Sequence, residues 1–378
     1  MPALVPTPDQ IIGGRDVTPA MRQWMDVQLT NAVEFDNDIT TLETDVAAIE
    51  AEIANIATPL YTNALVNGAF DVWQRGTSFS SGAGVVTTVD RWQIIRGGGV
   101  ANGEVTQGTP PTGFRYCARV GRTAGDASTQ VIFFSQCLET ADSIPMAGKT
   151  VALSFQARAG ANYSGGDMVV GIATGTGTDQ NVFSGYTGRA DPLTGAATLT
   201  TSYQTFTYTA TIPSTATELC VYFDYTPSGV AGAADYVEIA AVQLEIGSEA
   251  TSFAYEPFQT TLDRCARYFQ KSFPYATTPA QNAGTTGAHV FSGRVAGAVA
   301  NIVDSVQLSP RMRTTPTVTF YNPSAANAFA RNFTRTTNAT ATSTQALGDT
   351  GFGMSVTGIA GWAVNDLCGV NWTADAEL

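Results

Sequence analysis

Apolar side chains follow two different periods along this chain, and the change between them falls near residue 60. From Met21 to Leu60 they recur at spacings of three and four, interrupted only by Gln28, which is typical of a helix with one narrow apolar seam. Beyond residue 60 they alternate with polar residues in short runs between glycine-rich turns, which is typical of β-strands. The pattern predicts an N-terminal helix followed by mainly β structure.

The helical segment is predicted to span residues 19–59 and to form a coiled coil. Thr18 suits the N-cap, Pro19 suits the first helical position, and Pro59 ends the helix. Isoleucine at both the a and d positions of the heptads favours trimers or tetramers over dimers, and we predict a trimer. The predicted trimer core consists of Ile39, Leu42, Val46, Ile49, Ile53 and Ile56.

Acidic side chains flank this seam. In a parallel bundle, Asp38 would lie near Glu43 and Asp45 near Glu50 of the neighbouring chain. Each exposed repulsion costs at most about 1 kcal/mol, whereas each buried Ile or Leu returns roughly 1.5–3 kcal/mol. We therefore expect apolar packing to set the trimer, and we expect added salt or low pH to strengthen it.

The β part is predicted to contain two domains joined by a short helix. Residues 60–257 hold strand-like runs such as "TVALSFQAR" and "ELCVYFDY", which predict an antiparallel β-sandwich or jelly roll. Residues 258–271 are predicted to form the linking helix. Residues 272–378 alternate again and predict a C-terminal β tip domain with long loops. Residues 1–18, rich in Pro and Gly, are predicted to form an extended arm.

Charge and composition exclude several classes of protein. The 378 residues carry a formal net charge of −13, which argues against binding to nucleic acid. No apolar run is long enough to insert into a membrane, and the N-terminus does not read as a signal peptide. The five cysteines are scattered without a C-x-x-C pair, which predicts free, buried thiols.

The residues that catalysis requires are scarce. His289 is the single histidine, and it lies in a strand-like run rather than beside a nucleophile. No spacing of ligands suggests a metal site. Four aspartates in the middle of the chain could supply a glycosidase pair, but acids in glycine-rich loops usually form turns. We therefore predict no enzyme, no catalytic residue, no cofactor and no metal; those aspartates are Asp167, Asp179, Asp191 and Asp224.

Aromatic side chains suggest sugar binding, because flat apolar faces stack on pyranose rings. Trp73 and Trp92 are expected in the core. Aromatic and cationic residues in polar stretches are better surface candidates, and the segment "FARNFTR" suits an anionic glycan. The predicted carbohydrate-binding residues are Tyr163, Tyr186, Arg331, Phe333, Arg335 and Trp372.

Several motifs, taken in order, resemble a known family. They are "LVNGAFDVWQRGTSF" (65–79), "DRWQ" (90–93), "AGKTVALSFQARA" (147–159), "VQLEIGSEATSFAYEP" (242–257) and "LDRCARYFQKSF" (262–273). This set resembles a module of bacteriophage and prophage tail fibres that is similar to the jelly rolls of carbohydrate-binding modules. Those jelly rolls commonly hold a structural Ca²⁺. Here Ala240 and Ala241 stand where acids are expected, although Asp71 and Glu238 could supply oxygen ligands.

The resemblance implies a homotrimeric virion fibre that acts outside the cell. Its residues 1–18 would dock on structural proteins of the particle, and its distal end would meet host cell-surface polysaccharide. Two alternatives stay open: a head fibre or decoration protein with a structural role, and a glycan-depolymerising tailspike.

Overall fold

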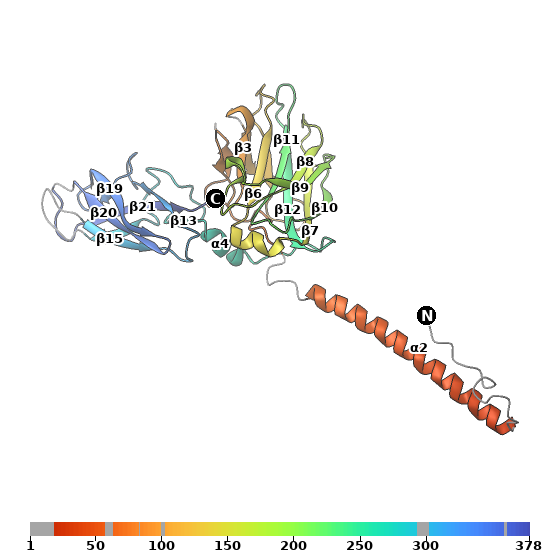
Figure 1. Cartoon of the computed structure of the whole chain (residues 1–378). Coiled ribbons are helices and arrows are strands. Elements are labelled where there is room, and N and C mark those ends of the chain that lie inside the picture. The colour runs from red at the N-terminus through yellow and green to blue at the C-terminus, as the bar shows by residue number, and fades with distance from the viewer. Residues whose placement is uncertain (1–18, 57–62, 83, 100–102, 293–301, 359–360) are drawn as a thin grey trace. The chain divides into compact units, whose positions relative to one another are not determined.

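The computed structural model divides the chain into two compact units, residues 1–61 and 62–378. It describes residues 19–56, 63–82, 84–99, 103–292, 302–358 and 361–378, and of these it gives only the backbone for residues 48, 50–56, 99, 302 and 303. The first unit contributes one long helix and the second is built mainly from β-strands (Figure 1). The mainly β class predicted from the sequence is therefore confirmed.

Helix α2 (Pro19–Ile56) forms the described part of the first unit and is 38 residues long. The predicted helix is confirmed over this range, whereas residues 1–18, Thr18 as its N-cap and the predicted end at Pro59 lie outside the described residues. Its seam is open to water: Phe35 is 72% exposed and Leu42 is 62% exposed. A single helix thus leaves unburied the side chains that most stabilise long helices in proteins.

Two six-stranded antiparallel sheets form the first part of the second unit. The first sheet has the order β1 (Ser78–Ser80), β4 (Gly103–Gln107), β5 (Ala118–Arg122), β12 (Tyr236–Ile246), β7 (Thr150–Ala159), β10 (Gln204–Thr211). The second has the order β2 (Val86–Thr87), β3 (Gln93–Arg96), β6 (Ile132–Cys137), β11 (Glu218–Tyr225), β8 (Met168–Gly175), β9 (Ala190–Ala197). Short helices lie in the connections between these strands: η1 (Gly97–Gly99), α3 (Thr140–Ser143), η2 (Ile144–Met146) and η3 (Val182–Ser184).

One apolar core lies between the two sheets, as the alternation predicted. Phe155 from the first sheet and Phe223 from the second meet edge to face, with ring centroids 4.9 Å apart. Trp92 is fully buried and stacks on Phe134 at 5.1 Å, while Trp73 is 4% exposed. The β-sandwich and the core positions of both tryptophans are therefore confirmed.

The segment that precedes the first strand closes the sandwich by docking on a bulge in β12. The register of β12 shifts between Ala240 and Gln243. There the Val242 N–H donates to the Gly68 carbonyl at 2.9 Å, and the Asn63 amide donates to the Val242 carbonyl at 2.8 Å. A Cβ at Gly68 would lie 2.0 Å from that carbonyl oxygen, so only glycine fits this close approach. The "NGAF" motif therefore attaches this segment to the bulge of β12.

The C-terminal part contains one helix and two further sheets. Helix α4 (Phe258–Ala266) precedes the larger sheet, in which β21 (Leu367–Asp375) is the central strand. Its other strands are β13 (Phe269–Lys271), β14 (His289–Ser292), β16 (Thr317–Tyr321), β17 (Arg331–Asn332) and β18 (Thr337–Asn338). The smaller sheet has the order β15 (Ile302–Gln307), β20 (Gly351–Thr357), β19 (Ala341–Gly348). A separate apolar cluster packs inside this part, and it includes Phe320, Met354 and Trp372.

The predicted linking helix is shorter than expected. It ends at Ala266, and Phe269, which we placed on its apolar face, instead begins β13 and pairs with Asp375 of β21. Helix propensity over a few residues is weak, and pairing with a central strand overrides it. The predicted domain boundaries themselves remain predictions.

Candidate functional site

The two tyrosines predicted as surface residues of the sandwich are largely covered. Tyr186 is 6% exposed and packs with Val182, Cys220 and Tyr222, so its expected surface position is wrong. The polar, glycine-rich residues around Tyr186 suggest an exposed loop. However, the chain folds back so that the ring packs on the outer face of the second sheet. Tyr163 is half-buried, its ring meets Tyr225 at 5.1 Å, and its hydroxyl donates to the Gly166 carbonyl.

One of the two arginines in the predicted cationic loop of the C-terminal part forms an ion pair. The Arg335 guanidinium donates to the Asp366 carboxylate at 2.5 Å, while Arg331 donates to the Asn338 side chain at 3.1 Å. The ring of Phe333 is half-buried. Asp366 accepts further hydrogen bonds from the Ala363 N–H and the Asn332 amide, and these hold its pKa below the ordinary value. Of the two cations in this loop, Arg335 is therefore paired with a carboxylate, while Arg331 bonds a neutral amide and keeps its charge.

Trp372 is also a core residue. It lies on β21, is 8% exposed and meets Phe352 edge to face at 5.5 Å. The expectation that it could stack on a sugar at the surface is wrong, because its side chain faces the apolar cluster between the two C-terminal sheets.

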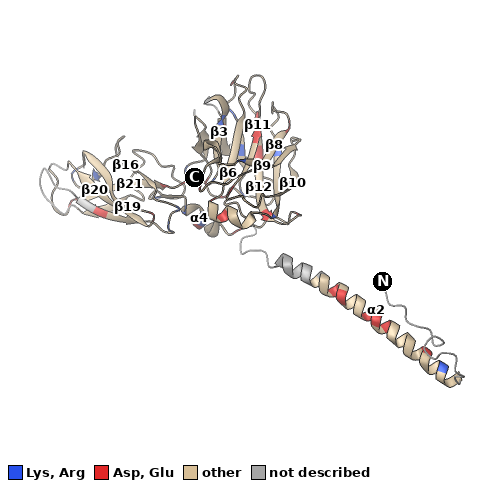
Figure 2. Ribbon diagram, viewed as in Figure 1, with Lys and Arg blue, Asp and Glu red and all other residues tan. Residues whose placement is uncertain are grey.

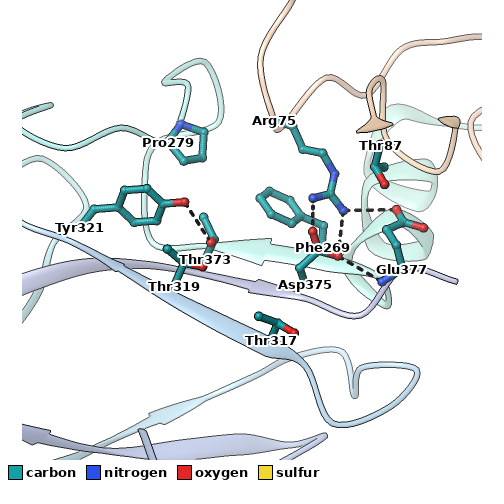
Figure 3. Close-up of a pocket in the computed structure, with 10 residues that line it drawn as sticks. All are labelled: Arg75, Thr87, Phe269, Pro279, Thr317, Thr319, Tyr321, Thr373, Asp375 and Glu377. Carbon is teal, nitrogen blue, oxygen red and sulfur yellow. Dashed lines mark hydrogen bonds and ion pairs between the residues drawn. The ribbon is translucent and has the colours of Figure 1, made fainter. Parts of the chain in front are cut away.

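An open hollow of about 570 Å³ lies where β16, β21 and β13 meet the loop that precedes β1 (Figure 3). Polar groups dominate its lining, which consists of Arg75, Thr87, Phe269, Pro279, Thr317, Thr319, Tyr321, Thr373, Asp375 and Glu377. Alternation places Thr317, Thr319 and Tyr321 of β16 on one face of the sheet, and Thr373 and Asp375 of β21 beside them. Figure 3 shows these hydroxyls and carboxylates gathered around the same space.

A fixed ion pair closes one end of the hollow. The Arg75 guanidinium lies 3.9 Å over the ring of Phe269 and donates to Asp375 at 2.5 Å and to Glu377 at 3.3 Å. Burial disfavours its charge, but the two carboxylates outweigh burial and raise the pKa of Arg75 above its ordinary value. Asp375 keeps 39% of its side chain exposed, so its carboxylate can accept hydrogen bonds from a ligand in the hollow.

The lining of the hollow offers groups that can bind a polar ligand. Four threonine hydroxyls, one tyrosine hydroxyl and a carboxylate held by arginine can exchange hydrogen bonds with a hydroxyl-rich ligand. The rings of Tyr321 and Pro279 supply the apolar faces, whereas Phe269 is 4% exposed and lies beneath the Arg75 guanidinium. Neither a histidine nor a cysteine lies among the residues that line it.

Sequence reasoning did not single out this hollow. Tyr321 is one of several aromatic residues in the C-terminal part, and Arg75 lies 300 residues before its partner Asp375. The alternating Thr317, Thr319 and Tyr321 were the available signal, because a strand places such residues on one face.

The groups considered for metal binding and hydrolysis have other partners. Glu238 accepts hydrogen bonds from Arg119 and Arg158, and Asp71 accepts one from the Tyr255 hydroxyl at 2.8 Å. No group of three metal-ligating side chains occurs among the residues described. His289 lies 3.2 Å from Asp304, in a half-buried position on β14.

Three of the four aspartates considered for a glycosidase pair bond nearby groups. Asp179 accepts from the Thr140 N–H, Asp191 pairs with Arg189, and Asp167 accepts from the Thr198 hydroxyl. The five cysteines are free and buried, as predicted. Over the ranges that the structure describes, no helix is both long and apolar enough to cross a bilayer.

Comparison with known proteins finds similarity only at the level of structure. No family model and no curated protein matches the chain. A carbohydrate-binding module, CBM4, is 21% identical, covering 48% of this chain and 98% of its own, with a TM-score of 0.31. TmCBM61 in complex with β-1,4-galactotriose is 12% identical, covering 50% of this chain and 100% of its own, with a TM-score of 0.31.

A phage protein also appears among the similar structures. The enzymatically active domain of bacteriophage CBA120 tailspike protein 4 is 15% identical over 50% of this chain and 22% of its own, with a TM-score of 0.31.

Proposed function

We propose that this chain is a non-enzymatic, homotrimeric fibre protein of a phage-like particle that attaches to glycans on a host surface. Residues 1–18 would dock on the particle, α2 would form the trimeric stalk, and the β part would carry the binding sites outside the cell. The observation that carries the proposal is the polar hollow of Figure 3, combined with an exposed heptad seam on α2.

The stalk is supported by which side chains α2 leaves exposed. Ile39, Leu42, Val46 and Ile49 occupy successive a and d positions and are between 50% and 62% exposed. Their burial in a three-stranded seam would return roughly 1.5–3 kcal/mol each. The side chains of Ile53 and Ile56, which complete the predicted core, lie outside the described residues. Figure 2 shows acidic residues along the same helix, so packing rather than charge pairing would hold the bundle together.

Glycan binding is supported by the lining of the hollow. Sugar recognition needs several hydroxyl partners placed beside a flat apolar face, and the hollow supplies both. A single open site of this kind binds weakly. Three copies per fibre, and several fibres per particle, would multiply the effective concentration and give firm attachment.

The decisive experiment combines oligomeric state with glycan binding on the full chain. Sedimentation velocity should give a trimer, and a glycan array should give binding to one or a few surface polysaccharides. Thr319→Val and Tyr321→Ala, both in the hollow, should weaken that binding at least about tenfold, which is 1.4 kcal/mol. Thr207→Val on exposed β10 is the matched control and should leave binding unchanged.

The outcomes separate this proposal from its alternatives. Loss of binding in Thr207→Val as well would place the site elsewhere. A trimer that binds no surface polysaccharide would favour a head fibre or decoration role. Release of oligosaccharides from host capsule would show a depolymerising tailspike instead. Antibody labelling of intact particles would show where on the particle the fibre attaches.

A further inference from the structure

Three neighbouring strands of the first sheet carry an arginine, a glutamate and an arginine directly opposite one another. Glu238 on β12 faces Arg119 on β5 and Arg158 on β7. Arg119 donates to one carboxylate oxygen at 2.9 Å and 2.7 Å, and Arg158 donates to the other at 2.6 Å. Because these side chains alternate with core residues such as Val237 and Ile239, they lie on the outer face of the sheet.

A tyrosine ring supports each guanidinium. Arg119 lies 4.2 Å over the ring of Tyr236, and Arg158 lies 4.8 Å over the ring of Tyr203. The Tyr203 hydroxyl donates to the Thr109 carbonyl at 2.8 Å, which fixes the position of that ring. Each cation is thus held along one edge by the carboxylate and across one face by an aromatic ring, and such arginines lose little freedom when they bind a ligand.

Together, Arg119, Glu238 and Arg158 carry a net charge of +1. Glu238 is fully buried beneath the two arginines, and it also accepts from the Thr109 N–H at 2.9 Å. Burial works to raise its pKa, but these donors outweigh burial and lower it, so the carboxylate stays ionised. Arg119 and Arg158 remain 33% and 26% exposed. Within the described part of the chain, neither arginine has a partner for its Nη1 atom.

Side-chain pairing between neighbouring strands does not by itself account for this arrangement. One arginine would already neutralise Glu238, and a second arginine on the same carboxylate adds repulsion between like charges. The excess charge stands out in a chain whose formal net charge is −13. It also contrasts with the Arg335–Asp366 pair, in which one carboxylate balances one cation.

We infer that Arg119 and Arg158 form a second ligand site, which takes the anionic substituent of an acidic polysaccharide. The substituent would be a carboxylate, sulfate or phosphate group on a sugar, bound by the free Nη1 atoms while Tyr203 and Tyr236 border the sugar ring. This inference rests on the proposed glycan binding. It places the site for an anionic glycan on the sandwich, whereas the sequence predicted it in the "FARNFTR" loop.

The test titrates the intact full-length protein with matched pairs of small sugars. The probes are trigalacturonate against its methyl ester, galactose 6-sulfate against galactose, and glucose 6-phosphate against glucose, each followed by calorimetry or NMR. At least one acidic probe should bind at least about tenfold more tightly than its neutral partner, and salt should weaken this preference. The strongest of the three identifies the anion.

Two variants assign the preference to these side chains. Arg119→Gln and Arg158→Gln should each remove it, while Arg189→Gln should preserve it. Arg189 is a suitable control because it is 41% exposed and pairs one to one with Asp191. Thermal unfolding of each variant establishes that it is folded. If one glutamine variant does not fold, the other variant and the wild-type comparison still decide the question.

Failure of this inference is distinguishable from failure of the proposed function. Equal binding of every acidic probe and its neutral partner by the wild type would overturn the inference, even if the hollow binds neutral glycans. A preference that survives in both glutamine variants would overturn it as well. Acid-dependent binding that Thr319→Val leaves intact would support the second site independently of the hollow.

Discussion

Asp224 is a carboxylate placed where it is poorly solvated. It lies on β11, directly opposite Phe133 on one side and Val169 on the other. Among the described residues no group donates a hydrogen bond to it, and burial raises its pKa from 3.8 to about 6. An acid whose pKa is higher in the folded state binds its proton more tightly there, so its contribution to stability falls as pH rises from about 4 to about 6.

We predict that Asp224→Asn stabilises the protein at pH 7. The amide removes the cost of an ionised, half-buried group, which we place at about 1 kcal/mol after allowing for the solvent that reaches it. Urea unfolding at pH 4.5 and pH 7 measures this. The free energy of unfolding of the variant should exceed that of the wild type at pH 7, and the two values should be nearly equal at pH 4.5. Equal gains at both pH values would show that charge is not the cause.

Gly68 gives a second prediction at this scale. In Gly68→Ala the new Cβ would lie 2.0 Å from the Val242 carbonyl oxygen, which belongs to the backbone and cannot rotate away. We expect a loss of about 3 kcal/mol in the free energy of unfolding, the upper end for overpacking. Gly166→Ala is the control, because a Cβ there meets nothing within 4 Å. Similar losses in both variants would mean that glycine flexibility, rather than contact, is responsible.

Single residues are the level at which sequence reasoning was least reliable. Tyr186 and Trp372 lie in polar or alternating stretches, and nothing local states that another segment covers them. The Arg119–Glu238 pair joins residues 119 positions apart, and Arg75 and Asp375 are 300 apart. Such pairings depend on strand order, which one sequence does not reveal.

Whole elements were predicted far better. The alternating run at residues 150–158 became β7, because a strand with one buried face must alternate. The three-four spacing became α2 for the corresponding reason. The run at residues 218–225 became β11, which is buried on both faces because Tyr186 and its neighbours pack on Cys220 and Tyr222. The end of α4 was missed because the partner of β13 lies about a hundred residues further along the chain.

Helix α2 yields a prediction about charge. A peptide of residues 19–60 should trimerise more tightly in 0.5 M than in 0.05 M NaCl, because salt screens the acidic residues that neighbouring chains bring together. Circular dichroism melts with sedimentation equilibrium measure this. A Glu43→Lys, Glu50→Lys peptide places opposite charges beside Asp38 and Asp45, and salt should weaken its trimer instead. A wild-type peptide that is most stable in low salt at pH 7 would contradict the proposed packing.

At the scale of the whole second unit, buried ions join the sandwich to the C-terminal sheets. Arg91, which precedes β3, pairs with Glu377 just after β21, and the two side chains are only 3% and 7% exposed. The Arg91 guanidinium also lies 3.5 Å over the ring of Tyr268 and donates to the Cys137 carbonyl. Arg267 reaches back to Glu139 at 2.6 Å. The two main apolar cores are separate, and a small cluster of Val66, Val72 and Cys265 joins α4 to the sandwich, so polar contacts share the connection with this cluster.

We predict that Glu377→Gln uncouples the two parts. Removing one partner leaves the Arg91 charge buried without compensation, which costs about 3–5 kcal/mol for a buried pair. Differential scanning calorimetry should give one transition for the wild type and two for the variant, and proteolysis of the variant should cut first between residues 258 and 290. Asp191→Asn breaks an exposed pair and should change stability by less than about 0.5 kcal/mol. If Glu377→Gln keeps one transition at the wild-type temperature, apolar contacts rather than Arg91 hold the second unit together.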